Sequence, residues 1–95
     1  MATYIILSRV SPEAFRTSKD LKQAAETVLA KLKSECPGVI WKDSYATMGR
    51  YDFIDTVVSD DPKKVEKAAM IIRAYGHSTT ETLPATLWKD FLEML

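Results

Sequence analysis

Three side chains that can take part in acid–base chemistry stand out in the second half of the chain: Tyr51, Asp55 and His77. Asp55 interrupts an apolar run at 51–59, and burial in such surroundings raises the pKa of a carboxyl group toward the range of a general base. His77 directly follows a glycine, and histidine changes its charge near neutral pH. We treat these three as candidate catalytic residues. A structural hydrogen bond for Asp55, core packing for Tyr51 and a surface position for His77 remain the alternatives.

Aromatic and hydroxyl side chains extend this set to candidate ligand-binding residues. Trp41 and Tyr45 alternate along one expected strand, so they share a face, and with Tyr51 they form an aromatic wall with inward hydroxyl groups. Ser8 lies in the first apolar run and is one of the expected hydrogen-bond partners of Asp55, the others being a threonine and a water molecule. The candidate ligand-binding residues are Ser8, Trp41, Tyr45, Tyr51 and Asp55. For the aromatic residues, ordinary core packing is the alternative.

Composition argues against several other classes of function. The 13 basic and 13 acidic residues cancel, so the chain lacks the positive surface that nucleic acid requires. One histidine and one cysteine are too few to build a zinc or iron site, so we expect no metal and no cofactor. No apolar stretch approaches the roughly 20 residues of a membrane helix. The single cysteine and the lack of a signal segment favour the cytoplasm.

Three further side chains are expected to have structural roles. Asp52 follows the expected hairpin turn, where its carboxylate can accept hydrogen bonds from backbone amides. Glu81 lies among threonines on an expected edge strand and is predicted to pair with a cation across the dimer, for example Arg9 or Arg50. Cys36 precedes a proline at a helix end, so we expect it to be inert.

The hydrophobic pattern predicts one domain over residues 1–95. Apolar and alternating runs predict four strands, at 3–10, 39–48, 51–59 and 77–84. Apolar stripes with helical spacing predict two long helices, at 18–35 and from Pro62 to Gly76, and a short last helix capped by Thr86. Helices and strands therefore alternate in the order β-α-β-β-α-β.

The polarity of the strands predicts how they are arranged. The runs 3–10 and 51–59 are apolar on both faces, which is typical of central strands, whereas 39–48 and 77–84 are more polar and suit the edges. This predicts an α+β, ferredoxin-like fold with an antiparallel sheet in the order 4-1-3-2. Right-handed crossovers place both long helices on one face and leave the other face bare. A second copy is the simplest cover for an apolar sheet, so we expect a homodimer or a larger homo-oligomer. We expect the last helix to help by covering either its own sheet or that of the neighbouring copy.

Three segments resemble one known family of proteins. They are Met-Ala-Thr-Tyr at 1–4, Tyr-Ala-Thr-Met-Gly-Arg-Tyr-Asp at 45–52 and Thr-Glu-Thr-Leu-Pro-Ala at 80–85. In this order and spacing they resemble the GYD domain family of small bacterial and archaeal proteins. The resemblance implies a dimeric α+β barrel, the architecture of muconolactone isomerase, of antibiotic-biosynthesis monooxygenases and of ligand-binding domains in some transcription regulators. It implies no activity, because relatives on this scaffold do different things. Two residues depart from the family pattern. The family usually has an apolar or small residue where this chain has Asp55, and often an acidic residue where this chain has Val58.

Two classes of function remain in view. The first is a small-molecule-binding or assembly module that dimerises and holds a small apolar or aromatic ligand in a pocket between its two sheets. The alternative is a cofactor-free isomerase, lyase or monooxygenase acting on a small aromatic or activated substrate. In that enzyme Asp55 or His77 would be the base, and Tyr45 or Tyr51 the hydrogen-bond donor.

Overall fold

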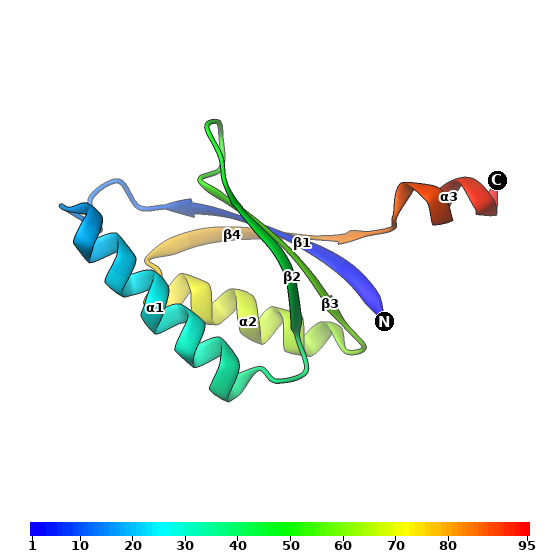
Figure 1. The fold of residues 1–95 in the computed structure, drawn as a ribbon, viewed down its shortest axis with the longest axis horizontal. Coiled ribbons are helices and arrows are strands. Elements are labelled where there is room, and N and C mark those ends of the chain that lie inside the picture. Colours follow the sequence, from blue (N-terminus) through cyan, green and yellow to red (C-terminus); the bar gives the residue numbers. More distant parts are fainter.

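The computed structural model describes residues 1–95 as one antiparallel sheet with two long helices against one face (Figure 1). The strands are β1 (Ala2–Val10), β2 (Ile40–Ala46), β3 (Phe53–Ser59) and β4 (Ser78–Ala85). The helices are α1 (Ser18–Glu35), α2 (Pro62–Tyr75) and α3 (Trp88–Met94). The sheet order is β2-β3-β1-β4, which confirms the predicted ferredoxin-like arrangement.

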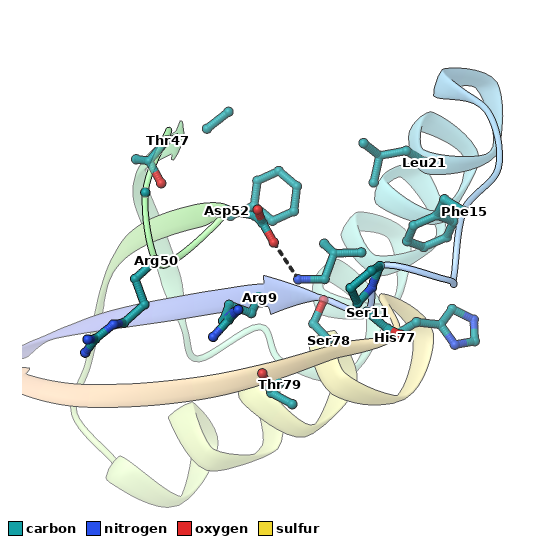
Figure 2. Close-up of a pocket in the computed structure, with 15 residues that line it drawn as sticks. Arg9, Ser11, Phe15, Leu21, Thr47, Arg50, Asp52, His77, Ser78 and Thr79 are labelled. Atoms are coloured by element: carbon teal, nitrogen blue, oxygen red, sulfur yellow. Dashed lines mark hydrogen bonds between the residues drawn. The ribbon is translucent and has the colours of Figure 1, made fainter.

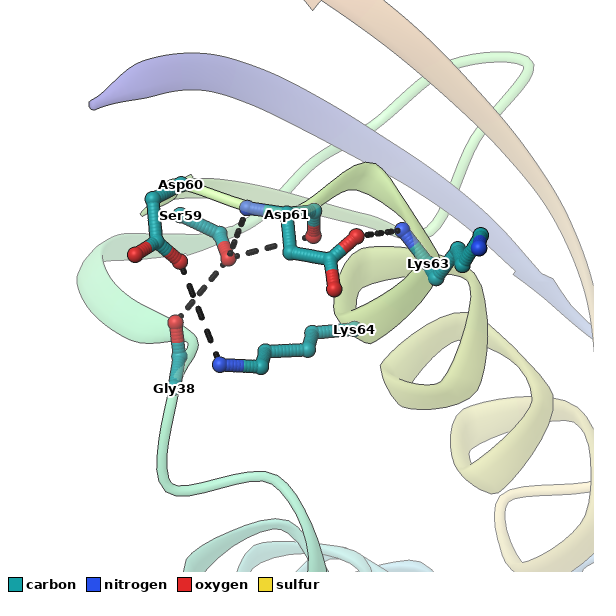
Figure 3. A network of polar contacts seen from close by, with 6 residues as sticks. All are labelled: Gly38, Ser59, Asp60, Asp61, Lys63 and Lys64. Carbon is teal, nitrogen blue, oxygen red and sulfur yellow. Dashed lines mark hydrogen bonds and ion pairs between the residues drawn. The ribbon is translucent and has the colours of Figure 1, made fainter.

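Local side-chain chemistry sets where the two long helices begin. The Thr17 hydroxyl accepts a hydrogen bond from the Asp20 amide at 3.1 Å, which satisfies one of the free amides in the first turn of α1. At α2, Asp61 accepts from the Lys63 amide at 2.9 Å, and Pro62 occupies the first helical position (Figure 3). These starts agree with the expected ones because capping needs only neighbours in sequence.

The chain between β3 and α2 is fastened to the loop before β2 by a polar network (Figure 3). The buried Ser59 hydroxyl donates to the Gly38 carbonyl at 3.0 Å and accepts from the Asp61 amide at 3.2 Å. Asp60 and Lys64 form an exposed ion pair at 3.9 Å, which contributes little to stability. Ser59 therefore links the end of the central strand β3 to the loop that follows α1.

Two small clusters form the core. Ile6 of β1 and Val57 of β3 are fully buried and pack against Val65 and Ile72 of α2. The second cluster, between α1 and α2, contains Leu32, Cys36, Ala68 and Ile71. Burial raises the pKa of the Cys36 thiol, which keeps it protonated and agrees with the expected inert role.

Helix α1 packs mainly on α2 and covers the sheet incompletely. Only Leu32 of its 18 residues is buried, whereas Leu21 and Leu29 on the apolar stripe are 37% and 50% exposed. A helix with a well-packed stripe would bury these leucines. Space therefore remains between α1 and the sheet.

Helix α3 lies beyond the end of β4, away from both layers (Figure 1). It begins at Trp88 after Leu87 without a side-chain cap, so the predicted Thr86 cap is wrong. None of its residues is buried, and Trp88 stacks on Phe91 with ring centroids 5.7 Å apart. The helix therefore covers no part of its own sheet, contrary to one of the two arrangements expected for it.

Candidate functional site

The structure divides the five candidate ligand-binding residues between the two faces of the sheet. Side chains of paired residues in neighbouring strands share a face. Asp55 pairs with Ile6, which is buried under the helices, so Asp55 lies on the helix-covered face. Ser8 lies two residues after Ile6 in β1 and therefore shares that face. Tyr45 pairs with Ile54, the neighbour of Asp55, and therefore lies on the open face.

A β-bulge in β2 separates Trp41 from Tyr45. Trp41 pairs with Val57, but Asp43 pairs with Thr56, so one extra residue, Lys42, lies between them. Trp41 therefore points to the helix face, and the prediction that Trp41 and Tyr45 share a face is wrong. An extra residue reverses the alternation from that point onward.

On the helix face, Asp55 and Trp41 bind one another. The Trp41 indole Nε1 donates to Asp55 Oδ1 at 3.0 Å, and the second carboxylate oxygen has no hydrogen-bond partner in the chain. Ser8 is 1% exposed and its hydroxyl also lacks a partner, so the expected bond between Ser8 and Asp55 is absent. All three residues line a cleft of about 540 Å³ between α1 and the sheet, and Tyr45 contributes to the same lining from the edge strand β2, although its pairing directs its side chain to the open face.

The open face is mainly apolar at its centre. The side chains on it from the two central strands and β4 include Ile5, Leu7, Ile54, Val58 and Leu83. Tyr45, on β2, is 58% exposed beside them. No other element of the chain covers this face (Figure 1).

One polar pair crosses the open face. The Tyr51 hydroxyl donates a hydrogen bond to the Glu81 carboxylate. This hydrogen bond is the main reason that the pKa of Tyr51 is raised, because an ionised phenolate would repel the carboxylate it now binds. Glu81 therefore has a partner within its own chain, and its expected pairing with a cation of a second copy stays a prediction.

The motif residue Asp52 fastens the β2–β3 loop to the end of β1 (Figure 2). Its carboxylate accepts from the Val10 amide at 2.8 Å, its own amide donates to the Ser8 carbonyl at 2.8 Å, and its carbonyl accepts from the Thr47 amide at 2.9 Å. The prediction that Asp52 binds backbone amides is confirmed, but the amide belongs to β1 instead of the turn. Asp52 therefore has a structural role.

Replacing Asp52 by alanine is expected to lower the free energy of unfolding by about 1–3 kcal/mol, because the half-buried Val10 amide loses a charged acceptor. Asp52→Asn keeps an acceptor oxygen and should cost less. Urea unfolding followed by circular dichroism measures both. An alanine variant as stable as the parent chain would show that the bond is replaced by water at no cost.

His77 lies at the rim of a broad hollow of about 1060 Å³ at the end of β1 (Figure 2). Its backbone has a left-handed φ of 48°, its carbonyl accepts from the Ser11 amide at 2.9 Å, and its ring packs edge-on against Phe15. Asp55 lines the other cavity, and Tyr51 lines neither. The three candidate catalytic residues therefore do not converge on one site.

The fold and the uncovered sheet define this chain as a small ferredoxin-like α+β protein. It belongs to the GYD domain family, whose sequence model matches residues 4–95. No helix combines the length and apolarity needed to cross a membrane.

Known proteins resemble the chain in sequence and in fold. The glutamine synthetase and cystathionine beta-lyase binding protein of Thermus thermophilus is 28% identical over 95 residues, which are 100% of this chain and 99% of that protein. The leucine response regulatory protein of Mycobacterium tuberculosis has a TM-score of 0.59 at 13% identity, over 94% of this chain and 54% of that one. A hypothetical protein from Pyrococcus horikoshii has a TM-score of 0.52 at 25% identity, over 92% of both chains. The structural likeness to the Mycobacterium protein concerns the fold alone.

Proposed function

We propose that this protein is an assembly module that dimerises through the open face of its sheet and, as a dimer, binds partner enzymes. The observation that carries the proposal is the uncovered apolar surface around Leu7 and Ile54. Monomeric soluble proteins rarely expose a continuous apolar patch of this kind, and sheets are usually covered on both apolar faces.

The exposed area of the chain supports dimerisation. The chain exposes 6884 Å² at a mass of 10.7 kDa. A compact monomer of this mass exposes about 5500 Å², so the excess is roughly 1400 Å². A standard interface buries about 800 Å² on each partner. The excess exposed area is therefore large enough for the open face to form a stable interface. The projecting α3 accounts for another part of the excess area.

The polar pair on the open face is compatible with burial between two sheets. A carboxylate enclosed without a partner would destabilise an interface, but Glu81 already accepts from the Tyr51 hydroxyl. A pocket between the two sheets would be lined by Tyr45 and Tyr51. It would lack Asp55, because that residue lies on the helix face.

Two observations support the proposal that the partners are enzymes: the name of the Thermus thermophilus relative and the exposed aromatic side chains of α3. The Thermus thermophilus relative, which matches this chain over its whole length, is named as a binding protein for glutamine synthetase and cystathionine beta-lyase. Helix α3 presents the stacked Trp88 and Phe91 to solvent, and buried aromatic residues dominate the binding energy of many protein interfaces. We therefore assign contact with the enzyme to α3, which projects from the dimerising domain.

Binding of the purified chain to purified glutamine synthetase and to cystathionine beta-lyase tests the partner half of the proposal. Biolayer interferometry should show saturable binding to at least one enzyme, and Trp88→Ala should weaken it by roughly 30-fold, the usual effect of losing an interface hot spot. Glu93→Ala, on the same helix, is the matched control and should leave binding unchanged. Absence of binding to both enzymes would contradict the partner half, and a monomeric parent chain would contradict the dimer half.

A further inference from the structure

The cleft between α1 and the sheet is an unfilled space with apolar walls. Its volume of about 540 Å³ lies within the range of small-molecule pockets. Leu21, Val28 and Leu29 of α1 line one side, and Phe53 and Trp41 of the sheet line the other. Protein interiors are normally packed without such gaps, and the two leucines that line this one are exposed by 37% and 50%.

The sheet side of this cleft carries two polar groups with unused hydrogen-bonding capacity. Ser8 is almost completely buried, and its hydroxyl has no partner. Asp55 uses one carboxylate oxygen to accept from Trp41, and the other accepts from no group of the chain. The basic residue in the lining, Lys22, forms no ion pair with Asp55. Asp55 is only partly buried, but a fully buried hydroxyl without a partner, such as that of Ser8, is rare in native structures and calls for an explanation such as a bound molecule.

We propose that this cleft binds a small, largely apolar molecule that carries an amine head group. An ionised carboxylate only accepts hydrogen bonds, and it binds charged nitrogen donors most strongly. The amine would donate to the free oxygen of Asp55, and the Ser8 hydroxyl, after rotation about its χ1 bond, would accept a second hydrogen from it. The apolar body would lie along Leu21 and Leu29, which it would shield from water.

This site goes beyond the proposed assembly function because it lies on the opposite face of the sheet. Its residues belong to the helix-covered face, whereas the dimer would form through the open face. The cleft therefore remains available in a dimer. Failure of dimerisation and failure of ligand binding are separate results.

Tryptophan fluorescence provides a direct test, because the chain has two tryptophans and one of them, Trp41, lines the cleft. The substitution Trp88→Phe leaves Trp41 as the only reporter. Phenylbutylamine should change its emission in a saturable way, whereas phenylbutyrate, of the same shape but opposite charge, should bind at least tenfold more weakly. Asp55→Asn in the same background should raise the dissociation constant of the amine at least tenfold.

Two matched variants make the test specific. Asp43→Asn removes a carboxylate on the open face of the same sheet and should leave the affinity unchanged. Ala24→Phe places a ring in the cleft and should abolish binding while the fold, checked by circular dichroism, persists. No saturable response to the amine would overturn the proposal, as would equal effects of the Asp43 and Asp55 substitutions. If Asp55→Asn does not fold, undiminished binding by the Ala24→Phe variant overturns it.

Discussion

Lysine in place of Ile54 is expected to convert the proposed dimer into a monomer. Ile54 lies at the centre of the open face, paired with Leu7 on one side and Tyr45 on the other. In a twofold dimer the substitution would place two ammonium groups in the interface, and each would lose its hydration without gaining a partner. We expect the dimerisation constant to weaken at least 1000-fold, which corresponds to about 4 kcal/mol. Sedimentation equilibrium measures this change.

Met70→Lys is the matched control for this experiment. Met70 is 54% exposed on α2, the helix that covers the other face of the sheet. The same new charge at that position should leave dimerisation intact. If the Ile54→Lys chain remains a dimer, the interface lies elsewhere. Equal weakening by both variants would indicate a general effect of charge.

The sequence predicted the fold well wherever burial imposed a strong pattern. The central strands β1 and β3 are apolar on both faces, and the long helices carry clear stripes between caps. The helix predicted from about residue 18 to about residue 35 agrees with α1. These features follow from local chemistry, since capping, prolines and periodicity are all visible within a few neighbouring residues. The uncovered face was predicted because right-handed crossovers place both long helices on the same face of the sheet.

The composition of the candidate site was less predictable. The alternation of Trp41, Asp43 and Tyr45 continues without interruption in sequence, and only pairing with β3 reveals the bulge that turns them to different faces. Strand β3 also begins at Phe53 instead of residue 51, because Tyr51 and Asp52 belong to the loop. The gap under α1 depends on the packing of three elements. No single segment of sequence contains that information.

The loop motif shows how a recognisable pattern can mark structure instead of chemistry. Asp52, the second residue of the Tyr-Asp pair, accepts a hydrogen bond from the Val10 amide. Tyr51, the first residue of the pair, reaches across the open face and donates its hydroxyl hydrogen to Glu81. Neighbouring residues thus fasten the hairpin to β1 and place a satisfied polar pair on the proposed interface. The sequence could predict that Asp52 binds amides, but the partner strand depends on sheet order.

The adjacent residues Ile6 and Ile5 provide the second prediction with a large effect. Ile6 is fully buried against Val57, Val65 and Ile72, so Ile6→Ala leaves a cavity in the main core cluster. We expect the free energy of unfolding to fall by about 2–5 kcal/mol. This is a large part of the roughly 5–15 kcal/mol that stabilises an ordinary domain. Urea unfolding followed by circular dichroism measures the loss.

Ile5→Ala removes the same atoms from the opposite face, which makes it both a control and a second test. Ile5 lies on the open face, so in the proposed dimer its contribution to stability would arise largely from contact with the second copy. Because the stability of a dimer depends on protein concentration, the cost of Ile5→Ala should shrink as the protein is diluted below its dimerisation constant. The cost of Ile6→Ala should stay the same. If the two substitutions cost equally at every concentration, the open face is buried within the monomer and cannot be the surface through which this protein assembles.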